Sequence, residues 1–203
     1  QTPIVGTVFI ILIFLCNLAY AFLARWYAVL HSGVKGERRL FRTVKKLHGT
    51  NIVFHNLPVR YKRGRSELDM LIVCHAGVLI IEVKNHSGTI SGSWRDDKWT
   101  QRKHYRDGKV TETMMDNPIK QMRRQRDIVK SILTAAGENV WIDSVLYFSS
   151  PNAKLKISLR ESDYVCCESA ELLEFLKSYD SGETLSKSRM EHIAQILRES
   201  SGV

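Results

Sequence analysis

Two apolar runs decide the fold of this chain, ELDMLIVC at residues 67–74 and GVLIIEVK at residues 77–84. They predict two neighbouring strands joined by a tight turn, and the second run suits a central strand covered on both faces. Three charged side chains, those of Asp69, Glu82 and Lys84, stand where a buried strand normally carries none. These three residues are therefore the first candidates for a functional site.

Pairing of the two strands would bring these charged side chains together. Side chains alternate faces along a strand, so Glu82 and Lys84 point the same way, and a hairpin places Asp69 at the same end of the sheet. Two buried carboxylates need a cation, a shared proton or an arginine, because an unpaired buried charge is very costly. A divalent ion with Lys84 beside a metal-bound water would hydrolyse a phosphodiester. A structural salt-bridge cluster at a strand end is the alternative interpretation.

A longer ordered set of residues surrounds this pair of strands. It consists of Gly36-Glu37, Glu67-Leu68-Asp69, Gly77-Val78, Ile81-Glu82-Val83-Lys84-Asn85, Gly88-Thr89-Ile90, Trp99-Thr100-Gln101, Asn117-Pro118 and Gln121. In these residues, over roughly positions 33–150, the chain resembles the nuclease-related domain (NERD) family, which is similar to the PD-(D/E)xK phosphodiesterases. The resemblance implies a restriction-endonuclease-like α/β fold, with a mixed sheet flanked by helices. Leu68 stands where the superfamily name has proline, a change that is frequent among its relatives.

The resemblance also implies the ligands and the chemistry of the site. Asp69 and Glu82 would hold Mg²⁺ or Mn²⁺, helped by the main-chain carbonyl of Val83. Glu37 would assist them, because a glutamate of the first helix often joins the metal site in these families. Lys84 would orient or deprotonate the attacking water and neutralise charge that develops on the phosphate.

Glu37 belongs to a predicted amphipathic helix at residues 33–48. The apolar stripe of this helix contains Leu40, Phe41, Val44, Leu47 and His48. Glu37 shares the side of this stripe, whereas the opposite side is strongly basic. It is either a first-turn acid favoured by the helix dipole or a third acidic group of the site.

A second helix is predicted to begin at Asn117-Pro118 and to run to about Ala136, because a polar cap followed by proline is typical of a helix start. Gln121 and Gln125 fall on or beside its apolar stripe. The family that the chain resembles has its Asn-Pro pair and this glutamine near the active site, which makes Gln121 a predicted site residue. A glutamine that faces the core can equally cap the backbone of a neighbouring strand.

Four cations are predicted to contact nucleic acid. Arg63 and Arg65 lie in a basic stretch, residues 58–66, that we expect to form a hairpin loop. Lys120 and Arg124 lie on the exposed side of the second helix. Charged loops and helix faces are more often simply solvated, so ordinary surface charge is the alternative interpretation.

The N-terminal part of the chain is a candidate membrane anchor. The 21 residues from Ile4 to Ala24 carry no charge, and a helix of this length spans a hydrocarbon core of about 30 Å. Arg25-Trp26-Tyr27 follows as a basic and aromatic edge, and then come Lys35 and three arginines. The positive-inside rule therefore predicts a single-pass protein whose large domain is cytoplasmic. A signal peptide is the alternative, because Ala19-Tyr20-Ala21 resembles a cleavage site.

The remaining patterns predict further elements of the same domain. We expect a strand at 51–57, a hairpin turn between Trp94 and Trp99, strands at 140–148 and 164–167, and helices at 169–179 (capped by Ser169) and 187–199. The two tryptophans would pack on the sheet or stack on bases. We divide the chain into an anchor and juxtamembrane segment at 1–30, a nuclease-related core at 31–150, and a part at 151–203 that completes the same domain.

Charge and cysteine content limit the classes of function that the chain can have. The formal net charge is +9, and residues 35–65 hold ten Lys and Arg against one acid, as expected for a surface that meets a polyanion. The four cysteines lack metal-ligand spacing and predict reduced thiols. We therefore expect a membrane-anchored, metal-dependent nuclease that acts on nucleic acid, with DNA as the expected substrate. The alternatives are a non-catalytic, membrane-tethered nucleic-acid-binding or scaffold module, and a basic face that contacts anionic lipid.

Overall fold

The computed structural model describes residues 2–201, without the side chains of residues 2–5, 25, 28–30 and 32. The chain separates into two compact units, residues 1–35 and 36–203. The described set lacks the side chains of Ile4 and Val5 in the expected anchor and of Arg25 at its basic edge. The predicted α/β architecture, with a mixed sheet flanked by helices and one apolar helix earlier in the chain, is confirmed.

Helix α1 runs without a break from Thr2 to Val44. Within it, Gly6–Ala24 has a mean hydropathy of 2.4 and none of its residues is buried, so this stretch is long and apolar enough to cross a membrane. The prediction of a helix at 33–48 is wrong at both ends, because the first helix simply continues and then stops at Val44. Leu40 is buried as predicted, whereas Phe41 is exposed and packs edge-on against His55.

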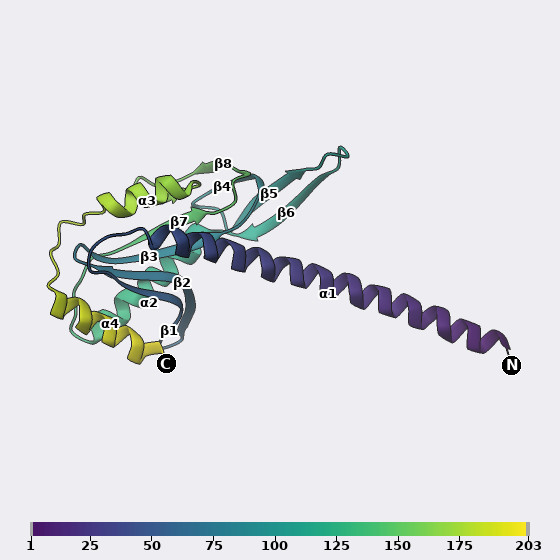
Figure 1. Ribbon diagram of the computed structural model, residues 1–203, viewed down its shortest axis with the longest axis horizontal. Coiled ribbons are helices and arrows are strands. Elements are labelled where there is room, and N and C mark those ends of the chain that lie inside the picture. Colours follow the sequence, from purple (N-terminus) through teal and green to yellow (C-terminus); the bar gives the residue numbers. More distant parts are fainter. Residues whose placement is uncertain (1, 202–203) are drawn as a thin grey trace. The chain divides into compact units, whose positions relative to one another are not determined.

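The second unit is built on a five-stranded sheet with the order β1-β2-β3-β7-β9 (Figure 1). Its strands are β1 (Ile52–Tyr61), β2 (Gly64–Cys74), β3 (Gly77–Lys84), β7 (Ile142–Phe148) and β9 (Tyr164–Cys166). The first three form an antiparallel meander, and β7 and β9 continue the sheet in parallel. The second apolar run of the sequence is thus a central strand, and Val78–Ile81 are buried.

A second sheet, which the sequence analysis missed, has the order β6-β5-β4-β8. Its strands are β4 (Gly88–Ser93), β5 (Lys98–His104), β6 (Val110–Asp116) and β8 (Ala153–Ser158). Strands β4 and β5 form the predicted tryptophan hairpin, and Trp99 is fully buried beside Ile90 and Phe148. The Trp99 side chain therefore packs in the core and is not available to stack on bases.

Three helices follow in the second unit: α2 (Pro118–Ala135), α3 (Ser169–Ser178) and α4 (Lys187–Ser201). Helices α2 and α4 cover one face of the five-stranded sheet, and α3 with the last turns of α1 covers the other (Figure 1). Asn117 caps α2 as predicted, since its Oδ1 accepts a hydrogen bond from the Ile119 N–H. The predicted cap Ser169 is wrong, because Glu168 occupies that position and makes no capping bond with its side chain.

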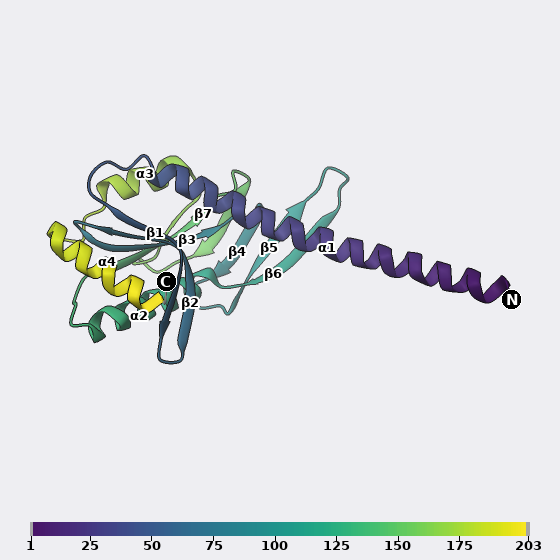
Figure 2. The ribbon, with the colours of Figure 1, turned by 60° about the horizontal axis from the view of Figure 1, so that its bottom comes forward.

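The predicted basic loop at 58–66 is also wrong, because the strands continue through it. Strand β1 extends to Tyr61 and β2 starts at Gly64, so only Lys62 and Arg63 form the turn. Lys62 has a left-handed φ of 52°, which the first central residue of a two-residue hairpin turn of type I′ or II′ adopts. Figure 2 shows this hairpin extending beyond the rest of the sheet. Arg65 therefore lies on strand β2 and not in a loop.

The β1–β2 ribbon changes face at Asp69. Leu68 packs in the cluster under α2 and α4, whereas Met70, two residues later, packs in the cluster on the opposite face. Regular alternation would put both side chains on one face. The pairing register passes from His55–Met70 directly to Leu57–Leu68 and leaves Asn56 and Asp69 out of the ladder. Asn56 has a left-handed φ of 47°. This local rotation leaves Asp69 half-buried in a strand whose following residues are fully buried.

Candidate active site

Asp69 marks the point where strands β2 and β3 separate. The last paired residues are Met70 and Ile81, and beyond them the Val83 N–H donates to Asp69 Oδ2 at 2.7 Å. A side-chain carboxylate thus replaces the main-chain carbonyl that would continue the ladder. This bond fixes the Asp69 carboxylate beside the strand segment that carries Glu82.

Glu82 is 1% exposed and lies at the centre of a polar network. Its Oε1 accepts from Lys84 Nζ at 2.6 Å and from Gln121 Nε2 at 2.7 Å, and its Oε2 accepts from Gln125 Nε2 at 2.7 Å. Lys84 Nζ also donates to Gln121 Oε1 at 3.0 Å. One cation and two amides therefore compensate the buried charge of Glu82.

Gln125 is a site residue that the sequence analysis did not select. It is fully buried, and its Nε2 donates to the Glu67 carbonyl at 3.1 Å as well as to Glu82. Its Oε1 is buried without a hydrogen-bond partner among the described residues. The sequence contained one signal for this role. Gln125 follows Gln121 by four residues, and residues i and i+4 lie on the same face of a helix.

The electrostatics of the site act most strongly on Asp69. Burial and the nearby charge of Glu82 raise the pKa of Asp69 from 3.8 to about 7. The Val83 N–H bond and the Lys84 charge lower this pKa, but they do not offset the first two causes. A second positive charge beside Asp69 and Glu82 would stabilise the ionised form of Asp69.

Glu37, from the last turns of α1, lies at the edge of this group. Its Oε2 accepts a hydrogen bond from Asn56 Nδ2 at 3.3 Å, and its charge contributes to the raised pKa of Asp69. The same charge raises the pKa of His55, which burial lowers by more. The predicted third acid is thus close enough to influence Asp69 electrostatically.

His86 is a further titratable group near the network. Burial and the charges of Lys84 and Lys103 lower the pKa of His86, whereas a hydrogen bond with Gln101 raises it. The lowered pKa keeps the imidazole neutral at physiological pH. His86 therefore adds no positive charge beside Lys84.

Asp69 and Glu82 offer the donor chemistry that Mg²⁺ or Mn²⁺ requires. Mg²⁺ is commonly held by one or two carboxylates together with water. A carboxylate has about four acceptor positions, and hydrogen bonds fill about three on Glu82. Across residues 2–201, no three His, Cys, Asp or Glu side chains converge closely enough to hold an ion. Asp69 and Glu82 are the two carboxylates that would hold an ion, with the Val83 carbonyl as the predicted third protein ligand.

The four cations predicted to contact nucleic acid occupy different environments. Arg63 is exposed in the turn of the β1–β2 hairpin, and Lys120 pairs with Asp97 at 2.5 Å. Arg65 and Arg124 line one pocket together with Arg60, which the sequence analysis had not selected. The structure thus brings two of the four candidates together.

The fold and this site define a nuclease-related α/β domain. Residues 32–149 match the nuclease-related domain, and the chain belongs to that family. It is also similar to an uncharacterized protein of Bacillus anthracis, with 34% identity over 71 residues. That match covers 34% of this chain and 34% of the relative, so it spans about a third of the relative's length. No solved structure matches the chain significantly.

Proposed function

We propose that this chain is a metal-dependent phosphodiesterase that cleaves nucleic acid, with DNA as the expected substrate. The observation that carries the proposal is the placement of Asp69 at the end of the β2–β3 ladder, beside the buried Glu82. Burial of Asp69 and the charge of Glu82 raise the pKa of Asp69 to about 7, and a bound cation would relieve the repulsion between the two carboxylates. A purely structural site has no need for this second carboxylate.

Each residue of the network has a role in this proposal. Asp69 and Glu82 would hold Mg²⁺ or Mn²⁺, with help from the Val83 carbonyl, and the ion would supply Lewis-acid stabilisation of charge on the phosphate. Lys84 donates to both Glu82 and Gln121, so its ammonium group is fixed where it can orient a water and offset negative charge. Gln121 would hold Lys84 in this position.

The alternative function is a membrane-tethered module that binds nucleic acid, or acts as a scaffold, without cleaving. One observation favours it: the Glu82 carboxylate already has three protein donors, which balance its charge without a metal. The partly neutralised Asp69 carboxylate favours the enzyme, because a raised pKa beside a fixed lysine is common at catalytic sites.

We further propose that α1 anchors the domain to a membrane through Gly6–Ala24, with the domain on the cytoplasmic side. Trp26 and Tyr27 are exposed at the end of the apolar stretch, where interfacial aromatics are expected. The cations Lys35, Arg38 and Arg39 follow within about 15 residues, which is the range in which the positive-inside rule operates. Retention of this segment, rather than cleavage as a signal peptide, is part of the proposal.

The test uses the full chain in detergent micelles. Linear, nicked, supercoiled and single-stranded DNA, and RNA, are each incubated with Mg²⁺, Mn²⁺ or chelator. Lys84→Ala is compared with Lys130→Ala, which removes an exposed cation of α2 outside the network. Metal-dependent cleavage that Lys84→Ala loses and Lys130→Ala keeps supports the enzyme. Salt-sensitive binding without cleavage by all three proteins would support the binding module instead.

A further inference from the structure

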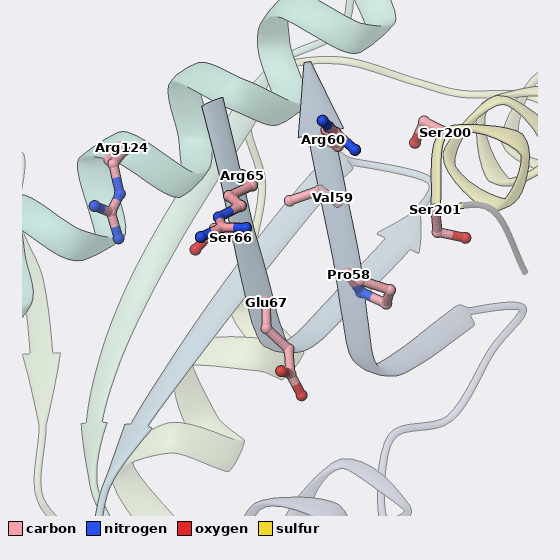
Figure 3. Close-up of a pocket in the computed structure, with 9 residues that line it drawn as sticks. All are labelled: Pro58, Val59, Arg60, Arg65, Ser66, Glu67, Arg124, Ser200 and Ser201. Carbon is pink, nitrogen blue, oxygen red and sulfur yellow. The ribbon is translucent and has the colours of Figure 1, made fainter. Parts of the chain in front are cut away.

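A basic pocket of about 510 Å³ lies between the β1–β2 hairpin, α2 and the end of α4. Figure 3 shows the three guanidinium groups that line it, from Arg60 on β1, Arg65 on β2 and Arg124 on α2. All three side chains are exposed, and none makes a hydrogen bond or ion pair with another described residue. The proposed catalytic chemistry uses none of them.

The pairing of Arg60 with Arg65 is unfavourable in the absence of an anion. These two residues are direct cross-strand partners in the β1–β2 ladder. Like charges in this arrangement destabilise a hairpin, and an acidic residue would normally be expected at one of the two positions. Arg124 adds a third positive charge from a different element. A bound anion would convert this repulsion into charge-assisted hydrogen bonds.

The walls of the pocket are held in place by the core. Val59, which precedes Arg60 in sequence, is 2% exposed, and a Cβ atom at Gly64 would lie only 3.3 Å from the side chain of Ile128 on α2. The hairpin is therefore fixed on the helix that also carries Arg124. The backbone of the site is thus in place before a ligand binds, and binding has to order only the three arginine side chains.

The other polar groups of the pocket do not neutralise the arginines. Ser200 and Ser201 already donate their hydroxyl hydrogens to the carbonyls of Leu197 and Arg198. The Glu67 carboxylate lines the pocket but points away from the three guanidinium groups (Figure 3). Three positive charges and one negative charge leave the pocket positive.

We propose that this pocket binds a backbone phosphate of the nucleic acid at a distance from the bond that is cleaved. Arg65 precedes Asp69 by four residues on β2, which corresponds to about 13 Å along the strand. Successive phosphates of one B-DNA strand rise about 3.4 Å along the helix axis and also rotate around it, so a phosphate about 13 Å from the cleaved bond lies about two nucleotides away. Gln125 links the two places, because it bonds both Glu82 and the Glu67 carbonyl. The inference rests on the proposed nucleic-acid substrate, but not on cleavage.

The experiment measures binding of a fluorescent DNA duplex to the full chain in detergent, at several salt concentrations and with chelator present. The pocket variant combines Arg60→Gln, Arg65→Gln and Arg124→Gln. The control variant removes the same charge from three exposed lysines outside the pocket, through Lys154→Gln, Lys156→Gln and Lys177→Gln. Circular dichroism of both variants verifies that they keep the fold.

We expect the pocket variant to bind about tenfold more weakly or worse, with a salt-dependence slope reduced by about 1, because one phosphate contact is lost. The control variant should change affinity by less than about threefold. Equal losses in the two variants, or no DNA binding by the unmodified chain, would overturn the inference. A chain that binds through the pocket but does not cleave would overturn only the proposed catalysis.

Discussion

Gln125 Nε2 lies 2.7 Å from Glu82 Oε2 and joins the buried carboxylate of β3 to the covering helix α2. Glu82 and Gln125 are 1% and 0% exposed, so water does not replace this bond if it is lost. The position of Glu82 in the proposed site thus depends on a neutral residue 43 positions later in the chain. This bond is tested most simply through the stability of the fold.

Gln125→Leu should lower the free energy of unfolding by about 1–3 kcal/mol, because it leaves a buried carboxylate oxygen without its donor. Urea unfolding of the full chain in detergent measures this change. Gln195→Leu is the matched control, since Gln195 is exposed on α4 and its side chain donates to Glu199 of the same helix. A loss below about 0.5 kcal/mol for Gln125→Leu would mean that the bond does not hold Glu82.

Asp69→Asn should stabilise the metal-free protein at pH 8 and have little effect at pH 3. Because folding raises the pKa of Asp69 from 3.8 to about 7, the folded state binds more protons in this window, and stability falls as pH rises through it. Asparagine removes this dependence, while its amide oxygen can still accept from the Val83 N–H. The gain above pH 7 should be about 2–4 kcal/mol.

Thermal unfolding of Asp69→Asn against pH, with the exposed Asp127→Asn as control, measures this effect. Mg²⁺ gives a second readout at pH 8, because an ion that binds the ionised carboxylate should raise the melting temperature of the unmodified chain alone. Parallel pH profiles for the unmodified chain and Asp69→Asn would contradict the assigned environment of Asp69.

Asn56→Ala should destabilise the domain by about 1–2 kcal/mol, whereas Asn56→Gly should be close to neutral. Asn56 has a φ of 47°, a conformation that glycine adopts readily and that alanine adopts at a cost. Both substitutions remove the bond to Glu37, so the difference between their unfolding free energies reports the cost of the backbone conformation alone. Chemical denaturation provides the comparison, and Asn51→Ala controls for loss of an asparagine where φ is negative. Equal losses for both Asn56 variants would rule out strain at this position.

Alternation along the second apolar run and its pairing with the first as a hairpin were sufficient to predict that Asp69, Glu82 and Lys84 lie at one end of the sheet. The apolar runs around them also identified the meander, because a central strand is apolar on both faces. Strand β8 was missed although Ala153, Leu155 and Ile157 alternate with polar residues, a pattern that predicts a half-buried strand. Strand β6 gave no such signal, since all of its side chains are exposed or half-buried.

The parts of the site that could not be predicted depend on long-range packing. The face change at Asp69 coincides with the left-handed Asn56 on the neighbouring strand, where the ladder leaves out both residues, and no local pattern indicates this interruption. Choosing between Gln121 and Gln125 requires the rotation of α2 over β3, and the structure uses both. The basic pocket joins Arg60, Arg65 and Arg124 only because α2 packs on the hairpin.

In the proposed function, Asp69, Glu82 and Lys84 form a metal-dependent catalytic site. The most direct measurement is the rate of DNA cleavage by the full chain in detergent, with Mg²⁺ or with chelator. Asp69→Asn, Glu82→Gln and Lys84→Ala are each compared with Lys130→Ala. We predict that chelator abolishes cleavage and that each of the three site variants loses about 100-fold or more, while Lys130→Ala keeps its rate. Cleavage that persists at the unmodified rate in all three site variants would contradict the assignment.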